Sequence, residues 1–76
     1  MLNVYRTIKN YVKGVQCLDY DKEVEVVSFV KNGNYVEVQV YNSTLYRVEV
    51  TDDNTGDEVF VKYLDLNGLY NLARKF

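Results

Sequence analysis

Apolar and polar residues alternate along several consecutive stretches of this chain, and the alternation constrains the fold more than any other feature. Residues 35–41 carry valine at every second position, with Glu37 and Gln39 between them. Residues 45–51 repeat the pattern. Because successive side chains of a strand point to opposite faces, a period of two predicts an antiparallel sheet with one buried face.

Four strands are expected, and the segments between them have the composition of turns. Asn32-Gly33 is a typical hairpin turn, and the polar residues 52–57 suit a longer loop. Residues 15–21 are expected to be a connector with room for a short extended piece. The expected strands are residues 22–31, 35–41, 45–51 and 58–64.

Residues 3–15 and 65–76 each gather their apolar side chains on one side of a helical wheel drawn at about 100° per residue. Asn3 and Asp65 are suitable N-caps, and Lys13 followed by Gly14 suits a helix end. The valine face of the sheet needs a cover, and both helices need an apolar surface to cover. The sequence therefore predicts one α+β domain over residues 1–76, a four-stranded antiparallel β-meander with N- and C-terminal helices packed on one face (α-β-β-β-β-α).

The same alternation predicts the register of the later strands. Pairing Tyr41 with Leu45 across the short turn places every inward valine of the second strand opposite an inward residue of the third. The expected pairs between the third and fourth strands are Val50 with Val59, Val48 with Val61 and Tyr46 with Tyr63.

The first expected strand, residues 22–31, is ambiguous. Val24 and Val26 share one face of a regular strand, whereas Val27 and Phe29 fall on the other. Either the strand contains a bulge or both of its faces are covered. If Val27 and Phe29 face outward, a homodimer through them is expected.

The residues that usually carry catalysis are scarce, so an enzyme is not expected. The chain has no histidine, and Cys17, its one cysteine, has acidic rather than basic neighbours, which disfavour a reactive thiolate. Glu37 and Glu49 are expected to face each other on the outer side of the sheet, as a tolerated like-charge pair rather than a catalytic dyad. Residues 52–58 suit a hairpin loop better than a calcium site, because strands rather than helices flank them. No cofactor and no metal are expected.

Charge is segregated along the chain. Residues 1–14 carry Arg6, Lys9 and Lys13 and no acid, whereas acidic residues outnumber basic ones in residues 19–25 and 52–65. Three cations on a chain of net charge −2 are too few for affinity to a phosphate backbone, so direct nucleic acid binding is not expected. The basic stripe is expected to be a solvated helix face. The acidic segments could form a local acidic patch if the fold brings them together.

The outer face of the sheet is the expected interaction surface. Tyrosine and arginine are enriched at the energetic centres of interfaces, and the chain has eight tyrosines. An alternative is that the rings only add cross-strand pairs to a weakly covered side. The candidate partner-binding residues are Tyr35, Tyr41, Leu45, Arg47 and Phe60.

The expected location is the cytoplasm. The chain has no apolar run of about 18 residues that could span a membrane, and residues 1–6 lack the apolar core of a signal peptide. In its size and its richness in Asn, Tyr, Lys and Val, the chain resembles the small accessory proteins of phages and mobile elements of low-GC bacteria. That resemblance implies an anti-defence protein that binds and blocks a host enzyme, acting in the host cell cytoplasm if it is phage-encoded.

The expected function is that of a small non-catalytic binding protein. It would inhibit or sequester a macromolecular partner, most simply a protein, by steric occlusion through the sheet face. One alternative is a nucleotide-binding sponge that acts as a homo-oligomer, with tyrosine rings stacking a base and Arg6, Lys9 or Arg47 meeting phosphate. Another is a structural subunit of a larger assembly.

Overall fold

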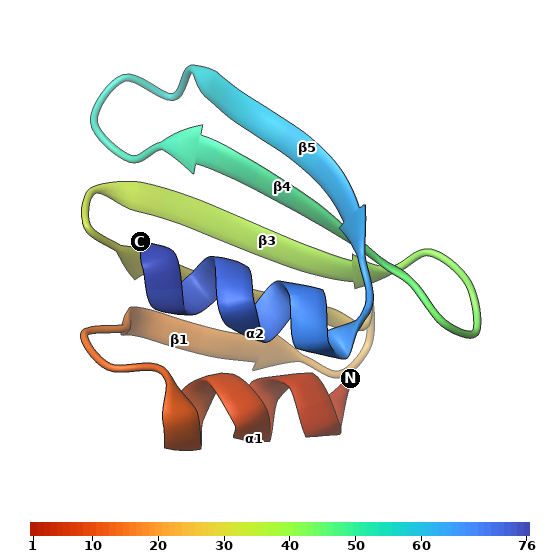
Figure 1. The fold of residues 1–76 in the computed structure, drawn as a ribbon. Coiled ribbons are helices and arrows are strands. Elements are labelled where there is room, and N and C mark those ends of the chain that lie inside the picture. The colour runs from red at the N-terminus through yellow and green to blue at the C-terminus, as the bar shows by residue number, and fades with distance from the viewer.

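The computed structural model describes residues 1–76 as two helices and one five-stranded antiparallel sheet (Figure 1). The strands lie in the sheet in chain order, so every neighbouring pair is joined by a turn or loop. None of the helices is long and apolar enough to cross a membrane. The elements are α1 (Leu2–Tyr11), β1 (Gln16–Asp21), β2 (Val26–Lys31), β3 (Asn34–Val40), β4 (Tyr46–Asp52), β5 (Glu58–Leu64) and α2 (Leu66–Lys75).

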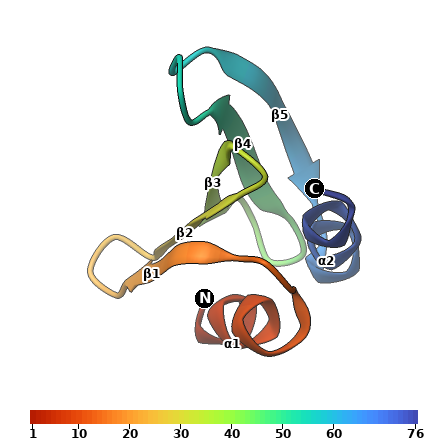
Figure 2. The same cartoon turned by 90° about the vertical axis from the view of Figure 1, so that its left-hand side faces the viewer.

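The predicted α+β architecture is confirmed, with one strand more than expected. Both helices lie on the same side of the sheet, and the sheet bends around them (Figure 2). The additional strand is β1, which forms where a connector was expected. The chain turns between β1 and β2 because the Asp21 carboxylate accepts hydrogen bonds from the backbone N–H groups of Glu23 and Val24. Glu25 then adopts a left-handed conformation, with φ of 55°.

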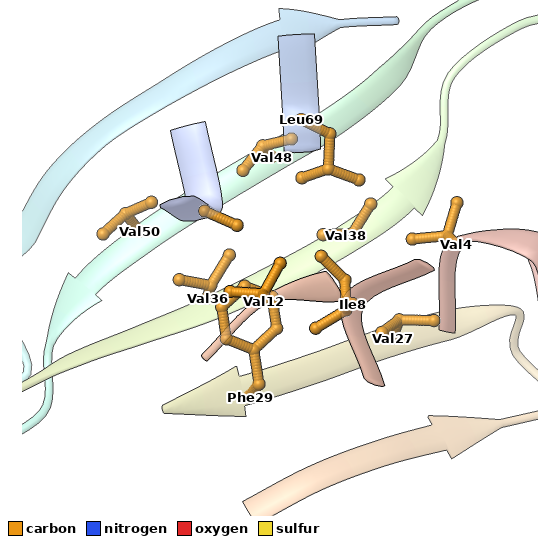
Figure 3. Packing of buried hydrophobic residues seen from close by; sticks show 11 residues of the cluster. Val4, Ile8, Val12, Val27, Phe29, Val36, Val38, Val48, Val50 and Leu69 are labelled. Atoms are coloured by element: carbon orange, nitrogen blue, oxygen red, sulfur yellow. The ribbon is translucent and has the colours of Figure 1, made fainter. Parts of the chain in front are cut away.

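Eleven buried apolar residues form the core between the sheet and the helices (Figure 3). Phe29 is the largest of them and lies on β2, beneath α1. The helices contribute four core residues, each helix from one side as its amphipathic pattern predicts, and Val12 follows directly after α1. The core residues are Val4, Ile8, Val12, Val27, Phe29, Val36, Val38, Val48, Val50, Leu69 and Ala73.

The two helices begin differently. Asp65 caps α2 as predicted, since its Oδ1 accepts a 2.7 Å hydrogen bond from the backbone N–H of Gly68. The predicted cap at Asn3 is wrong, because α1 begins after Met1 and has no side-chain cap. Helix α1 also ends earlier than expected, at Tyr11, and Gly14 follows in the left-handed conformation that glycine tolerates.

The ambiguity of the first strand is resolved by where β2 begins. Val27 and Phe29 are fully buried against the helices, so they cannot form the outward patch on which a dimer through them would depend. Val26 instead faces away from the core. The irregularity lies in β1, where the register shifts between Gln16 and Asp19 and Cys17 is left-handed.

The register between β3 and β4 is confirmed. Val36 pairs with Val50 and Val38 with Val48. The turn between these strands closes through a 3.0 Å hydrogen bond from the backbone N–H of Tyr41 to the carbonyl of Leu45.

The predicted register between β4 and β5 is wrong by one residue over most of its length. The hairpin starts as expected, with Thr51 opposite Glu58, but a shift before Val50 then pairs that valine with Phe60. Such a shift marks a β-bulge, which inserts one extra residue and reverses the faces of everything beyond it. The bulge turns Phe60 and Leu64 toward the core, where both pack against it.

Candidate functional site

The candidate site is the side of the sheet that neither helix covers, here called the open face. It is built from the outward side chains of all five strands, which the register aligns in rows that cross the sheet. The central row, from β1 to β5, is Asp19, Ser28, Glu37, Glu49 and Val61. The row beside it is Asp21, Val26, Gln39, Arg47 and Tyr63.

The open face is acidic, and only some of its carboxylates were predicted to lie there. These two rows contain four carboxylates and one guanidinium. Glu37 and Glu49 were expected on this face, and their pairing across β3 and β4 is confirmed. Asp19 and Asp21 were missed as members of the face because β1 was read as a connector.

Glu37 and Glu49 each have a partner on their own strand, two residues away. The hydroxyl of Tyr35 donates a 3.0 Å hydrogen bond to Glu37, and the guanidinium of Arg47 lies 3.0 Å from a carboxylate oxygen of Glu49. These partners reduce the cost of placing like charges opposite each other, which is otherwise destabilising. The arrangement is that of a tolerated pair.

Glu37 and Glu49 contribute to raised pKa values of their partners Tyr35 and Arg47. Burial raises the pKa of the Tyr35 phenol, and its hydrogen bond to Glu37 raises it further, against an opposing contribution from Ser28. The hydrogen bond to Glu49 raises the pKa of Arg47. Tyr35, Glu37, Glu49 and Thr51 surround a shallow hollow of about 180 Å³ on the open face. That volume is below the range typical of small-molecule sites.

One corner of the open face carries an aromatic cluster. The rings of Tyr41 and Tyr63 are 4.6 Å apart, and Arg47 sits beside Tyr63 in the same row. Both tyrosines are about half exposed or more, at 60% and 49%. Large side chains of these types, adjacent and accessible, are suited to bind a partner surface.

The structure separates the five predicted partner-binding residues. Tyr41 and Arg47 lie at the aromatic corner, and Leu45 is half-buried in the adjoining turn. Tyr35 lies on the open face but farther along the strands, beside Glu37. Phe60 does not belong to the face: its ring stacks on Phe76 at 6.4 Å, on the helix side of the sheet.

Two residues that were assigned to the core take the place of Phe60. Val61 and Tyr63 were expected to face inward, but the bulge at the start of β5 places them on the open face. The sequence carries only a weak signal for this exchange, because both alternating sets of β5 contain apolar residues. Lys62, which enters the inward set, extends its ammonium over the Phe60 ring at the sheet edge.

No group of three or more His, Cys, Asp or Glu side chains is placed to hold a metal ion. In the loop before β5, Asp52 accepts hydrogen bonds from the backbone N–H groups of Asn54 and Thr55, so its carboxylate stabilises the turn itself. Cys17 is exposed in the bulge of β1.

Comparison of the chain with known proteins finds no matching family model, no matching curated protein and no matching solved structure. What the protein does must therefore be inferred from its own surfaces.

Proposed function

We propose that this protein is a non-catalytic binding protein that docks its open face on a basic surface of a protein partner and blocks that surface. The observation that carries the proposal is the acidic central row, Asp19, Glu37 and Glu49, on a sheet face that the protein's own helices leave uncovered. A partner that uses the blocked surface to hold nucleic acid would be inhibited by steric occlusion. An anti-defence role in a host cytoplasm is the setting that fits this mechanism.

The carboxylates and the aromatic corner would contribute to binding in different ways. Carboxylates facing a basic patch accelerate association and exclude partners of the wrong charge, while adding less to affinity. Affinity would come from the aromatic corner of Tyr41, Tyr63 and Arg47, since a few tyrosine and arginine side chains dominate most interfaces. The strands hold the carboxylates, Arg47 and Tyr63 in fixed register, which lowers the entropic cost of binding.

The experiment compares three proteins in quantitative pull-downs followed by mass spectrometry: wild type, a double variant at the aromatic corner and a matched control. The corner variant is Arg47→Ala with Tyr63→Ala. The control, Lys22→Ala with Tyr11→Ala, removes the same kinds of side chain from exposed positions outside the open face. A true partner should be retained by wild type and control and be lost from the corner variant.

Affinity of the identified partner is then measured against salt. Raising the ionic strength from about 0.05 to about 0.5 M shortens the screening length and should slow association markedly. A partner that binds the corner variant as tightly as wild type, or binds independently of salt, would contradict the proposal.

A further inference from the structure

A basic hollow lies on the opposite side of the molecule, at the carboxyl ends of both helices. The two helices run in the same direction, so these ends lie together, at the left of Figure 1. The hollow has a volume of about 510 Å³, within the range of small-molecule sites. Its lining residues are Tyr11, Lys13, Lys31, Tyr70, Arg74 and Lys75.

None of the four basic side chains that line the hollow forms an ion pair. The two ion pairs of the protein involve Met1 with Glu25 and Arg47 with Glu49, both elsewhere. Four cations converge here although the chain as a whole carries a net charge of −2. The helix dipoles oppose an anion at this end, but each contributes only about half a charge. The hollow is therefore suited to an anion of more than one negative charge.

Lys31 is the most informative of the four. The residue lies at the end of β2 and is 8% exposed, and its ammonium donates a 2.9 Å hydrogen bond to the carbonyl of Ala73 in α2. An ammonium has three N–H donors, and the Ala73 carbonyl satisfies one of them. The Lys31 ammonium has no counter-ion in the structure, so an anion in the hollow would both pair the charge and use the remaining donors.

Two aromatic rings, the exposed Tyr11 and the half-buried Tyr70, extend the hollow along the groove between the helices. Tyr11 and Tyr70 meet edge to face at 6.2 Å, and the guanidinium of Arg74 lies over the Tyr70 ring at 5.0 Å. The same two tyrosines line a second hollow of about 370 Å³, together with Thr7, Leu66 and Asn67. The groove therefore joins a cationic end to an aromatic and amide-bearing end.

We propose that this groove binds a nucleoside di- or triphosphate. Lys13, Lys31, Arg74 and Lys75 would hold the phosphates, and the Tyr11 and Tyr70 rings would contact the base. The cations surround one hollow and do not form a track along α1. Lys9, for example, lies over the Tyr5 ring, which packs toward Tyr20 of β1 and away from the groove. A compact ligand fits this distribution better than a nucleic acid strand.

The site and the open face are independent surfaces. Each proposal can fail without the other, because one concerns a small anion at the helix ends and the other a protein on the sheet.

The test is calorimetric titration of the full chain with ATP in the absence of magnesium, beside inorganic triphosphate, adenosine and a short oligothymidylate. ATP should bind with a sub-millimolar Kd and more tightly than triphosphate, and adenosine should bind weakest. Backbone amide NMR shifts on adding ATP should centre on Tyr11 to Gly14, Lys31 and residues 70–75. Equal binding of ATP and triphosphate, tighter binding of the oligonucleotide, or shifts on the open face would each overturn the proposal.

Two variants of equal charge change make the test specific. Lys13→Gln with Arg74→Gln should weaken ATP binding about tenfold or more, since it removes two charge-assisted contacts. Lys22→Gln with Lys62→Gln, which lies outside the hollow, should leave the Kd within about twofold of wild type. Both variants replace exposed side chains and leave Lys31 in place, so folding is preserved. Equal effects of the two pairs would mean that ATP responds only to net charge, and the site would be rejected.

Discussion

The two faces of the sheet are built by the same alternating strands, but one is buried and apolar and the other is uncovered and acidic. The covered face is apolar and fully buried along its centre, where Val36, Val38, Val48 and Val50 pack beneath the helices. The open face places Glu37 and Glu49 between those valines, in the same strands and one residue out of phase. Burial determines the first set, whereas nothing in the fold requires the second set to be acidic. The open face is therefore where the fold leaves the sequence free for function.

Replacing a side chain on each face of β2 should give the largest difference. Phe29→Ala removes the largest buried side chain and should lower the free energy of unfolding by about 3–5 kcal/mol. That loss is comparable to the whole stability of a domain of this size. Val26→Ala, on the open face of the same strand, should lower it by less than about 1 kcal/mol. Urea unfolding followed by circular dichroism would measure both, and similar losses would show that the two faces are not distinct.

Loosening the cover of the buried face should have a smaller effect. Asp65→Ala removes the hydrogen bond to the Gly68 N–H and should cost about 1 kcal/mol. Asp65→Asn keeps a side chain that caps nearly as well, and should stay close to wild type. Amide hydrogen exchange would locate the change in α2. Faster exchange in α1, which has no side-chain cap to lose, would mean that the effect is not local.

Neutralising a carboxylate of the open face should affect stability little. Glu37→Gln relieves the repulsion from Glu49 and keeps an acceptor for the Tyr35 hydroxyl, so the free energy of unfolding should rise by about 0.3 kcal/mol at low salt. The gain should shrink in high salt. Glu23→Gln in the exposed turn before β2 is the matched control. A loss of more than about 1 kcal/mol would show that Glu37 is needed for folding rather than free for binding.

The smallest effect is expected at high pH. Burial and the neighbouring Glu37 raise the pKa of Tyr35 in the folded protein. The protonated phenol therefore contributes to the free energy of unfolding in full below the unfolded pKa of about 10. The contribution is lost as the pH rises through the folded pKa. Tyr35→Phe should therefore show a flatter fall in stability above about pH 10 than wild type, with no change of slope between about pH 7 and 9. Parallel curves above about pH 10 would contradict the assignment.

Local pattern was sufficient to predict the fold class, because both helices and the two strands β3 and β4 carry clear periodicity. The register of β3 and β4 followed from the three-residue turn and the alternating valines, both of which are local. Strand β1 was missed because Cys17, in the left-handed region, interrupts its alternation and shifts its register against β2. The sequence alone does not show this irregularity, because only the pairing of β1 with β2 defines it.

The candidate site was predicted only in part for a related reason. Tyr35 and Arg47 belong to strands with regular register, and their faces were correctly predicted. Phe60 was placed on the wrong face because a bulge after Glu58 is invisible in a strand where both alternating sets are apolar. The basic hollow could not be predicted at all, since it joins Lys13, Lys31 and Arg74, which lie far apart in the chain.

The order of the strands has a consequence for how the chain folds. Each strand pairs with the strand that precedes it in the sequence, so the sheet can form hairpin by hairpin. Each step closes only a short loop, which costs little entropy. The contact between α1 and α2 is different, because it joins the two ends of the sequence across the whole sheet. We expect it to form last. The ends of the helices that line the basic hollow would then come together only in the final step of folding, after every hairpin is in place.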